Sequence, residues 1–110
     1  MTPAAARRVL GLVGLGARAR SAVVGVEQVR SAAFRGKLKL ALVAADVSEH
    51  STDKVLPLLR ARRIRVIEGL TAAQLGQATG RERTAAIGIV DWQLAKGIRE
   101  VVDSGSGGAQ

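Results

Sequence analysis

Apolar positions along the chain fall into two kinds of run, and each kind predicts an element. Short apolar or β-branched runs predict strands at residues 21–24, 38–45, 64–68 and 85–90. Around them, apolar residues recur at three- and four-residue spacing and predict helices at 4–15, 26–35, 51–63, 71–79 and 92–102. Four strands, each followed by a helix after a leading helix, predict an α/β fold: a three-layer α/β/α sandwich with a mixed four-stranded sheet and about five helices.

The arrangement of this sheet follows from how apolar each strand is. Runs 38–45 and 85–90 are almost continuously apolar, which is typical of strands covered on both faces, so we expect them at the centre. Helical connections predict mainly parallel pairing, although a strand as short as 21–24 could join either way. Residues 1–103 are expected to form one domain, and 104–110 (SGSGGAQ) a flexible tail.

Several residues mark where the predicted helices begin, bend or end. The Thr71–Gln74 spacing predicts a capping box, Asp91 is expected to cap the last helix, and Pro57 should kink the helix at 51–63. Gly36 and Gly80 are expected to stop the helices that precede them. Each of these signals is local.

Composition removes several classes of function. The chain of 110 residues has no cysteine and one histidine, which excludes disulfide scaffolds, thiolate metal sites, cysteine nucleophiles and multi-histidine relays. Only two aromatic residues are present, Phe34 and Trp92, which argues against a module that stacks successive bases on rings. We expect neither a cofactor nor a metal.

Charge points to a polyanionic partner. The formal net charge is +8, and 13 of the 17 basic residues are arginine, whose planar fork suits phosphates and base edges. Residues 1–65 hold 13 basic and 4 acidic side chains, whereas 66–110 hold 4 basic and 5 acidic ones, which predicts a charged face on the N-terminal half. The alternative is a solvated basic surface that serves solubility.

The N-terminal segment imitates a secretory signal only poorly. Arg7 and Arg8 precede an apolar run at 9–17, but the run is short, contains three glycines and is followed by Arg18 and Arg20. No segment approaches the roughly 20 apolar residues of a membrane span. We therefore expect a cytoplasmic protein without membrane contact, and we expect it to be a monomer.

Two patterns that could indicate an enzyme have simpler explanations. Residues 14–19 fit the loose G-x-G-x-x-A fingerprint of dinucleotide sites, but a predicted helix rather than a strand leads into them. Asp46, Ser48, Glu49 and His50 cluster after the central strand, yet neighbours within one turn diverge too much to form a catalytic triad. We interpret Asp46, Ser48 and Glu49 as turn and cap residues and His50 as solvated, and we expect no small-molecule substrate.

The turn at Gly25 is the better candidate site. Gly25 should end a strand and begin a helix, which leaves the amides of Val26, Glu27 and Gln28 free for an anion. The side chains of Glu27 and Gln28 could accept hydrogen bonds from guanine edges, although a carboxylate is also simply favourable at a helix start. Cations expected around this turn are Arg18, Arg20, Arg30 and Arg35.

The order of these motifs resembles the bacterial branch of the L7Ae/L30e ribosomal-protein family of kink-turn RNA binders. The likeness spans about residues 8–100 and rests on these segments: 10–15 (LGLVGL), 23–32 (VVGVEQVRSA), 38–51 (LKLALVAADVSEHS), 56–68 (LPLLRARRIRVIE) and 75–91 (LGQATGRERTAAIGIVD). The resemblance implies an α/β/α sandwich that grips a kinked RNA helix at its tandem sheared G·A pairs. Contacts would come from the start of the second helix and from the loops after the central strand and before the last one.

The resemblance also assigns residues, with departures. The family's G-x-N-E-x-x-K pattern falls on Gly25 to Ser31; only the glycine is kept, with Glu27, Gln28 and Ser31 at the other three positions. Arg30 could partly replace the missing lysine, and Arg20 stands where glycine is expected. The A-x-D element matches Ala44 to Asp46, and L-G-x-A-x-G matches residues 75–80. In the last loop, the family's contact positions hold Arg81, Glu82, Arg83, Thr84 and Ala85.

Two functional hypotheses follow. The first is a non-catalytic protein that binds structured RNA, kink-turn RNA or ribosomal RNA among the candidates. The second is a protein-interaction module on the same fold with weakened or lost RNA affinity. The RNA-contacting residues expected under the first hypothesis are Arg18, Arg20, Gly25, Val26, Glu27, Gln28, Arg30, Ser31, Asp46, Arg81, Arg83, Thr84 and Ala85.

Overall fold

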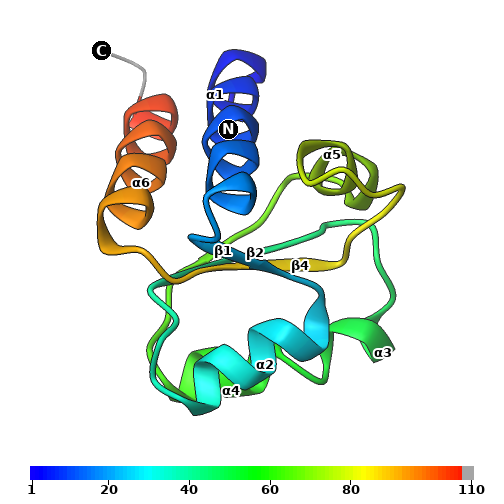
Figure 1. The fold of residues 1–110 in the computed structure, drawn as a ribbon. Helices are drawn as coiled ribbons and strands as arrows, with labels where there is room; N and C mark the ends of the chain where they lie inside the picture. Colours follow the sequence, from blue (N-terminus) through cyan, green and yellow to red (C-terminus); the bar gives the residue numbers. More distant parts are fainter. Residues whose placement is uncertain (108–110) are drawn as a thin grey trace.

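The computed structural model of the chain describes residues 1–107. Its elements are α1 (Pro3–Arg18), β1 (Ala22–Val24), α2 (Val26–Phe34), β2 (Leu40–Val43), α3 (Glu49–Thr52), α4 (Leu56–Ala61), β3 (Val66–Ile67), α5 (Ala72–Ala78), β4 (Ala86–Ile89) and α6 (Trp92–Gly107). Helices α1, α5 and α6 cover one face of the sheet, and α2, α3 and α4 cover the other (Figure 1). The expected three-layer α/β/α sandwich is confirmed.

The four strands form one mixed sheet in the order β1-β4-β2-β3. As expected, the two most apolar strands, β2 and β4, lie at the centre and are buried along their whole length. In β2, Leu40 and Leu42 join the core beneath α1, α5 and α6, whereas Ala41 and Val43 join the core beneath α2 and α4. Alternate side chains thus serve opposite layers, which is why the run shows no polar positions.

The expectation of mainly parallel pairing is wrong. Only β2 and β3 pair in parallel, and β4 is antiparallel to both β1 and β2. The reason lies in the segment after α5, which turns back along its helix until the amide of Thr84 donates to the carbonyl of Ala72 at 3.0 Å. The chain runs along α5 and then returns along the loop to the start of that helix. Strand β4 therefore starts at the end of the sheet where β3 stops, and it must run in the opposite direction.

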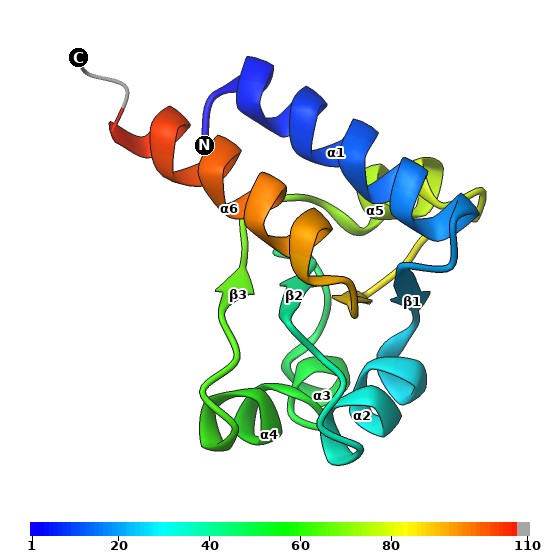
Figure 2. The ribbon, with the colours of Figure 1, turned by 60° about the vertical axis from the view of Figure 1, so that its left-hand side comes forward.

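The predicted helix at 51–63 is two helices instead of one kinked helix. Helices α3 and α4 are separate (Figure 2). Helix α3 ends at Thr52, and Pro57 lies in the first turn of α4. The first amides of a helix have no intrahelical partner, so a proline there costs no hydrogen bond, and its fixed φ suits the helix. Pro57 therefore begins a helix and does not kink one, as had been predicted. This split raises the number of helices in the described residues to six.

The local capping signals are confirmed. Thr71 and Gln74 form the reciprocal capping box of α5, with bonds of 3.1 and 2.9 Å, and the Asp91 carboxylate accepts from the amide of Leu94 at 2.8 Å. Gly36 and Gly80 follow the helices they were expected to stop, with φ of 69° and 76°. These contacts need only a few neighbouring residues, so they can be read from sequence.

The last helix extends into the segment that was predicted to be a flexible tail. Helix α6 continues to Gly107, so residues 104–107 are helical, and 108–110 lie outside the described residues. Adding one residue to an existing helix costs far less than starting a helix, which lets a Gly/Ser sequence continue an amphipathic one. Helix α6 packs beside α1, as both views show (Figures 1 and 2). Within the described residues, no helix is both long and apolar enough to cross a membrane.

An exposed ion pair ties β3 to α6. The Arg65 guanidinium donates two hydrogen bonds to the Asp103 carboxylate, at 3.0 and 2.7 Å. These bonds raise the pKa of Arg65 and lower the pKa of Asp103 below its ordinary 3.8. A carboxylate with a lowered pKa stabilises the fold fully above its ordinary pKa and loses that contribution as pH falls through the lowered value.

Arg65→Gln should therefore destabilise the protein slightly at pH 6, and less as the pH falls below 3.8. Urea unfolding of Arg65→Gln and of the unmodified protein at pH 6 and at pH 2 measures this difference. A difference in the free energy of unfolding that stays constant from pH 6 to pH 2 would contradict the assigned cause.

Candidate nucleic-acid interface

Segments from three parts of the chain meet at one end of the sheet, which we call the Gly25 end. Strands β1 and β2 finish there and β4 begins, since Val24 lies opposite Ile87 and Val43 opposite Ala86. The amide of Gly25 donates to the carbonyl of Ala86 at 2.8 Å, and the amide of Ala44 to that of Ala85 at 2.9 Å. The start of α2, the turn after β2 and the loop before β4 thus form one surface.

Helix α2 begins at this end without a side-chain cap. Its first intrahelical bond runs from the amide of Val29 to the carbonyl of Gly25 at 3.0 Å, and the amides of residues 26–28 precede it. Glu27 and Gln28 are exposed. Gly25 has φ 106° and ψ 152°, a conformation open essentially to glycine alone. The predicted helix start, uncapped and with two exposed polar side chains, is present.

The expected cations are only partly at this turn. Arg30 pairs with Glu27 at 3.1 Å, and its guanidinium lies 5.9 Å from the centre of the Phe34 ring. Ser31 is exposed one turn beyond Glu27 and Gln28, so the position where the family pattern has lysine carries a hydroxyl. Arg35 follows the other end of α2 and does not reach the turn.

A shallow hollow of about 170 Å³ opens beside the start of α2. Val26 and Glu27 line it from α2, Ala85 from the loop before β4, and His50, Ser51 and Lys54 from the α3 region. Lys54 was not predicted from the sequence because this segment was expected to be one continuous helix, and His50 was expected to be solvated. The available signal was the position of this segment directly after the central strand.

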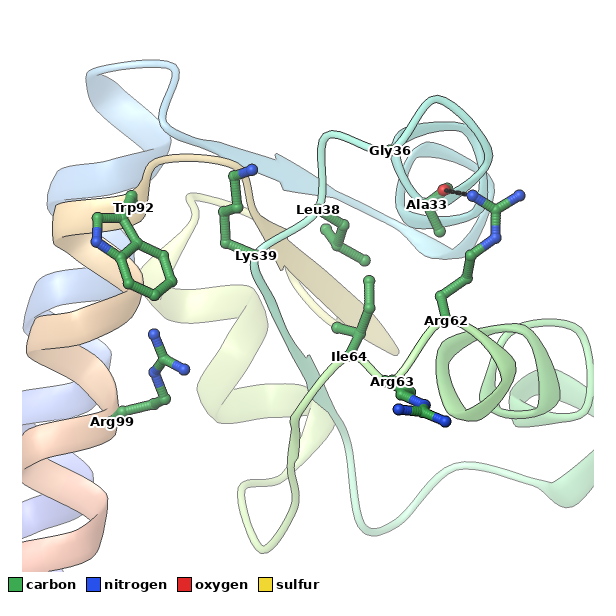
Figure 3. A pocket seen from close by; sticks show the side chains of 9 residues that line it. All are labelled: Ala33, Gly36, Leu38, Lys39, Arg62, Arg63, Ile64, Trp92 and Arg99. Carbon is green, nitrogen blue, oxygen red and sulfur yellow. Dashed lines mark hydrogen bonds between the residues drawn. The ribbon is translucent and has the colours of Figure 1, made fainter.

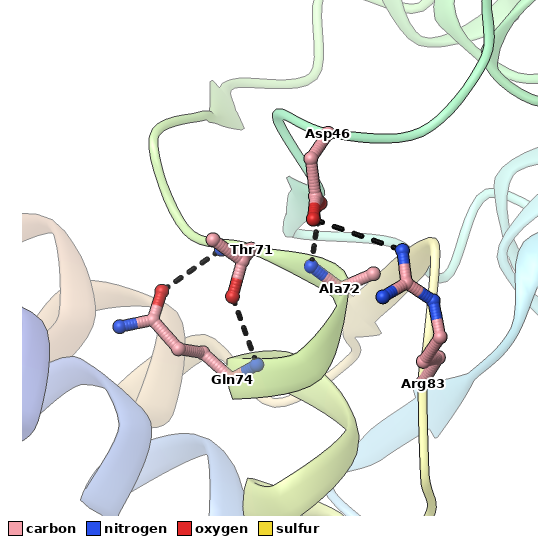
Figure 4. Close-up of polar contacts among 5 residues, drawn as sticks. All are labelled: Asp46, Thr71, Ala72, Gln74 and Arg83. Carbon is pink, nitrogen blue, oxygen red and sulfur yellow. Dashed lines mark hydrogen bonds and ion pairs between the residues drawn. The ribbon is translucent and has the colours of Figure 1, made fainter.

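Asp46 is at the Gly25 end, but its carboxylate is already engaged. One oxygen accepts from the amide of Ala72 at 2.8 Å, and the other lies 3.7 Å from the Arg83 guanidinium (Figure 4). Beside it, Thr71 and Gln74 close the capping box (Figure 4). Asp46 therefore joins the turn after β2 to the start of α5 and to the last loop.

Elsewhere in the 46–50 cluster, Ser48 has a structural role at the start of α3. Ser48 caps α3 by accepting from the amide of Ser51 at 3.3 Å, which confirms its interpretation as a cap residue. Asp46, in contrast, accepts from the distant amide of Ala72 and not from an amide of its own turn. Among the described residues, no group of three His, Cys, Asp or Glu side chains is placed to hold a metal ion. The decoy fingerprint at 14–19 lies in α1 and its C-cap, so no strand leads into its glycines.

The last loop presents its residues unequally. Arg81 and Arg83 are exposed, and Ala85 is half-buried at the hollow. Thr84 is only 5% exposed, and its hydroxyl has no hydrogen-bond partner among the described residues. The surface at this loop is therefore made by Ala85, Glu82 and the two arginines, with Thr84 beneath it.

Arg18 and Arg20 do not surround the Gly25 turn. They precede β1, whose first residue lies opposite Ile89 at the other end of the sheet. Arg18 instead lines a hollow between α1 and the end of α5, together with residues 77–80. The sequence places these arginines near Gly25 along the chain, but the length of β1 separates them.

Arg20 adopts φ 62°, in the left-handed region where the family pattern has glycine. Arg20→Gly should relieve this conformation and raise the free energy of unfolding by about 0.5–1 kcal/mol, after glycine's greater freedom in the unfolded chain is subtracted. Urea unfolding measures the gain. Arg20→Ala removes the charge and keeps the conformation, so an equal gain in that variant would assign the effect to charge.

Comparison with known proteins agrees with this architecture. The model of the ribosomal protein L7Ae/L30e/S12e/Gadd45 family matches residues 7–99. The chain belongs to this family. The match covers α1, the sheet and the start of α6, so the Gly25 end of this L7Ae/L30e-type chain lies wholly inside the family region. The resemblance found in the sequence is confirmed.

Individual relatives extend the match over nearly the whole chain. The chain is 29% identical over 97 residues to the RNA-binding protein YlxQ of Enterococcus faecium, covering 88% of this chain and 93% of that protein. A Bacillus halodurans protein of unknown function superposes with a TM-score of 0.79 at 30% identity, over 86% of this chain and 96% of the other. The Giardia lamblia 15.5kD RNA binding protein shares the fold, with a TM-score of 0.78 at 21% identity over 97% and 92% of the two chains.

Proposed function

We propose that this protein binds structured RNA without catalysing a reaction, and that it recognises a kinked helix with G·A pairs through the Gly25 end. Family membership supports RNA as the partner, as does the similarity of the chain to the RNA-binding proteins of E. faecium and G. lamblia. The net charge of +8 favours the same class of partner.

The observation that carries the proposal is that the Gly25 end brings together three kinds of group that RNA can contact: backbone amides, polar side chains and an apolar wall. The uncapped start of α2 offers amides and the positive end of a helix dipole to a phosphate. Glu27 and Gln28 offer acceptors for guanine N1–H and N2–H, and Gln28 can also donate to O6. Between α2 and the last loop, Val26 and Ala85 offer an apolar wall to an unstacked nucleotide.

The departures from the family pattern change which side chains supply charge. Ser31 carries none, and Arg30 is shared between Glu27 and the Phe34 ring. Lys54, across the hollow from Glu27, supplies a cation on the other wall. Phosphate neutralisation at this end therefore falls to Lys54 and Arg83, of which Arg83 is also held near Asp46.

RNA shape and salt provide the first test. A kink-turn RNA with tandem G·A pairs should bind more tightly than a straight duplex of equal length, and log K should fall steeply with log salt because each neutralised phosphate releases counterions. Fluorescence anisotropy with labelled RNAs measures both. Indifference to salt and shape would reject the proposal and favour a protein-interaction module.

Single variants separate base recognition from phosphate attraction. Gln28→Ala should lose roughly 1–3 kcal/mol of binding free energy on G·A-paired RNA and little on a plain duplex, as should Glu27→Ala. Lys54→Ala should weaken all RNAs alike and reduce the salt slope by about one. If Glu27→Ala tightens every RNA equally, Glu27 is only a helix-start carboxylate.

A further inference from the structure

Both aromatic residues of the chain are exposed, and arginine covers each ring. Phe34 and Trp92 are each 57% exposed. The Arg62 guanidinium lies 5.8 Å from the centre of the Phe34 ring, where Arg30 also contacts it, and the Arg99 guanidinium lies 4.8 Å from that of Trp92. Two large rings in so aromatic-poor a chain are thus kept at the surface and paired with cations.

Trp92, Arg99 and Arg62 line a hollow of about 340 Å³, and Phe34 lies outside its lining, against Arg62. Trp92 and Arg99 project from α6 on one side of it, and Arg62 and Arg63 lie on the opposite side (Figure 3). The buried Leu38 and half-buried Ile64 contribute apolar lining. Four charged side chains line the hollow, and all four are basic: Lys39, Arg62, Arg63 and Arg99. We call Phe34, Trp92 and these four residues the aromatic–arginine surface.

This surface lies at the opposite end of the sheet from Gly25. Lys39 directly precedes β2, and Trp92 follows β4 by three residues, whereas Asp46 follows β2 and Ala85 precedes β4. The four residues of β4 alone separate the two ends by roughly 13 Å along the strand. A nucleotide held at the Gly25 turn therefore does not occupy the aromatic–arginine surface.

Arg99 lies near enough to Asp103 to lower the pKa of that carboxyl, so the cations most available to a ligand are Lys39 and Arg63. Among the described residues, no carboxylate lies within ion-pair distance of Lys39 or Arg63. Arg62 is held in place by donating to the carbonyl of Ala33 at 3.0 Å, which still leaves other donors of its guanidinium (Figure 3). The nearby Asp91 carboxylate is occupied in capping α6.

We propose that the aromatic–arginine surface is a second RNA-contacting site, which takes a single-stranded segment. One base stacks on the indole of Trp92, and the adjoining phosphates contact Lys39 and Arg63. A base stacked at Phe34 would extend the same path along Arg62. The site rests on the proposed function only for the class of its partner, because its residues are separate from those at the Gly25 end.

Paired rings and guanidinium planes favour RNA over an acidic peptide. Every base has a π face that can stack on an aromatic ring or on an arginine plane. A peptide carboxylate would satisfy the cations but leave both exposed rings unused. The surface therefore fits a ligand that carries negative charge and flat rings together.

Trp92 is the only tryptophan, so its fluorescence reports directly on this site. Titration with a ten-nucleotide oligouridine RNA, which has no helix and no G·A pairs, should quench the emission saturably and less strongly at high salt. Poly-glutamate should leave the emission unchanged. Quenching by poly-glutamate equal to that by RNA would overturn the proposal in favour of an acidic protein partner, and absence of quenching by RNA would also overturn it.

Variants assign the binding by anisotropy of labelled oligouridine. Trp92→Ala should weaken it about 5- to 10-fold, the low end of what base stacking contributes, while Trp92→Phe should retain most of the affinity. Lys39→Glu with Arg63→Glu should abolish it, and Gln28→Ala should not change it. Equal affinity of Trp92→Ala and the unmodified protein would overturn the site. If the unmodified protein binds oligouridine but fails to bind G·A-paired RNA, that result would instead count against the proposed role of the Gly25 end.

Discussion

Gly76→Ala is expected to destabilise the fold and weaken RNA binding together. A Cβ at this position would lie 2.7 Å from the carbonyl carbon and oxygen of Glu82 and 2.8 Å from the amide nitrogen of Arg83. These are backbone atoms, so the return loop itself must move. We expect the free energy of unfolding in urea to fall by about 1–3 kcal/mol, the usual cost of overpacking.

The same displacement should affect the Gly25 end, because this loop leads into Ala85. Affinity for G·A-paired RNA should fall at least tenfold under conditions where the variant remains folded, as anisotropy would show. Gly11→Ala is the matched control: its Cβ would meet nothing within 4 Å, and alanine in an exposed helix is favoured by up to about 1 kcal/mol. Unchanged stability of Gly76→Ala would contradict the close crossing of loop and helix.

Gly25→Val is expected to have the second large effect. At φ 106° and ψ 152° a β-branched residue is strained, at a cost of about 1–3 kcal/mol. Relief of this strain would rotate the first turn of α2 and its free amides, and the added side chain would stand where RNA approaches. Affinity for G·A-paired RNA should fall beyond tenfold, measured by anisotropy on protein shown to be folded.

Gly36→Ala controls for the strain in that experiment. Gly36 also has positive φ, 69°, and lies after the far end of α2, so alanine there should reduce stability without reducing G·A-paired RNA affinity. If the two variants lose RNA affinity equally, the loss reflects general destabilisation and not the Gly25 turn.

Features encoded by neighbouring residues were predictable from the sequence. The capping box at Thr71 and the cap at Asp91 need only three-residue spacings, and the central positions of β2 and β4 follow from their unbroken apolar runs. The family pattern located the start of α2 and the loop before β4. Arg20, which stands where the family pattern has glycine, has a left-handed backbone conformation.

Features that depend on distant parts of the chain were not predictable. The direction of β4 depends on a loop that folds back over Gly76, which no periodicity reveals. The distance of Arg18 and Arg20 from Gly25 depends on which end of β1 each faces. A count of two aromatic residues argued against stacking, but it could not show that both rings lie at the surface beneath arginines.

Amide chemical shifts of the ¹⁵N-labelled protein during titration with a G·A-paired kink-turn RNA test the central claim most directly. We expect the largest changes at the amides of Val26, Glu27 and Gln28 and at Ala85, with the outer face of α1 unchanged. Changes confined to α1, or none at the Gly25 end at saturating RNA, would contradict this expectation.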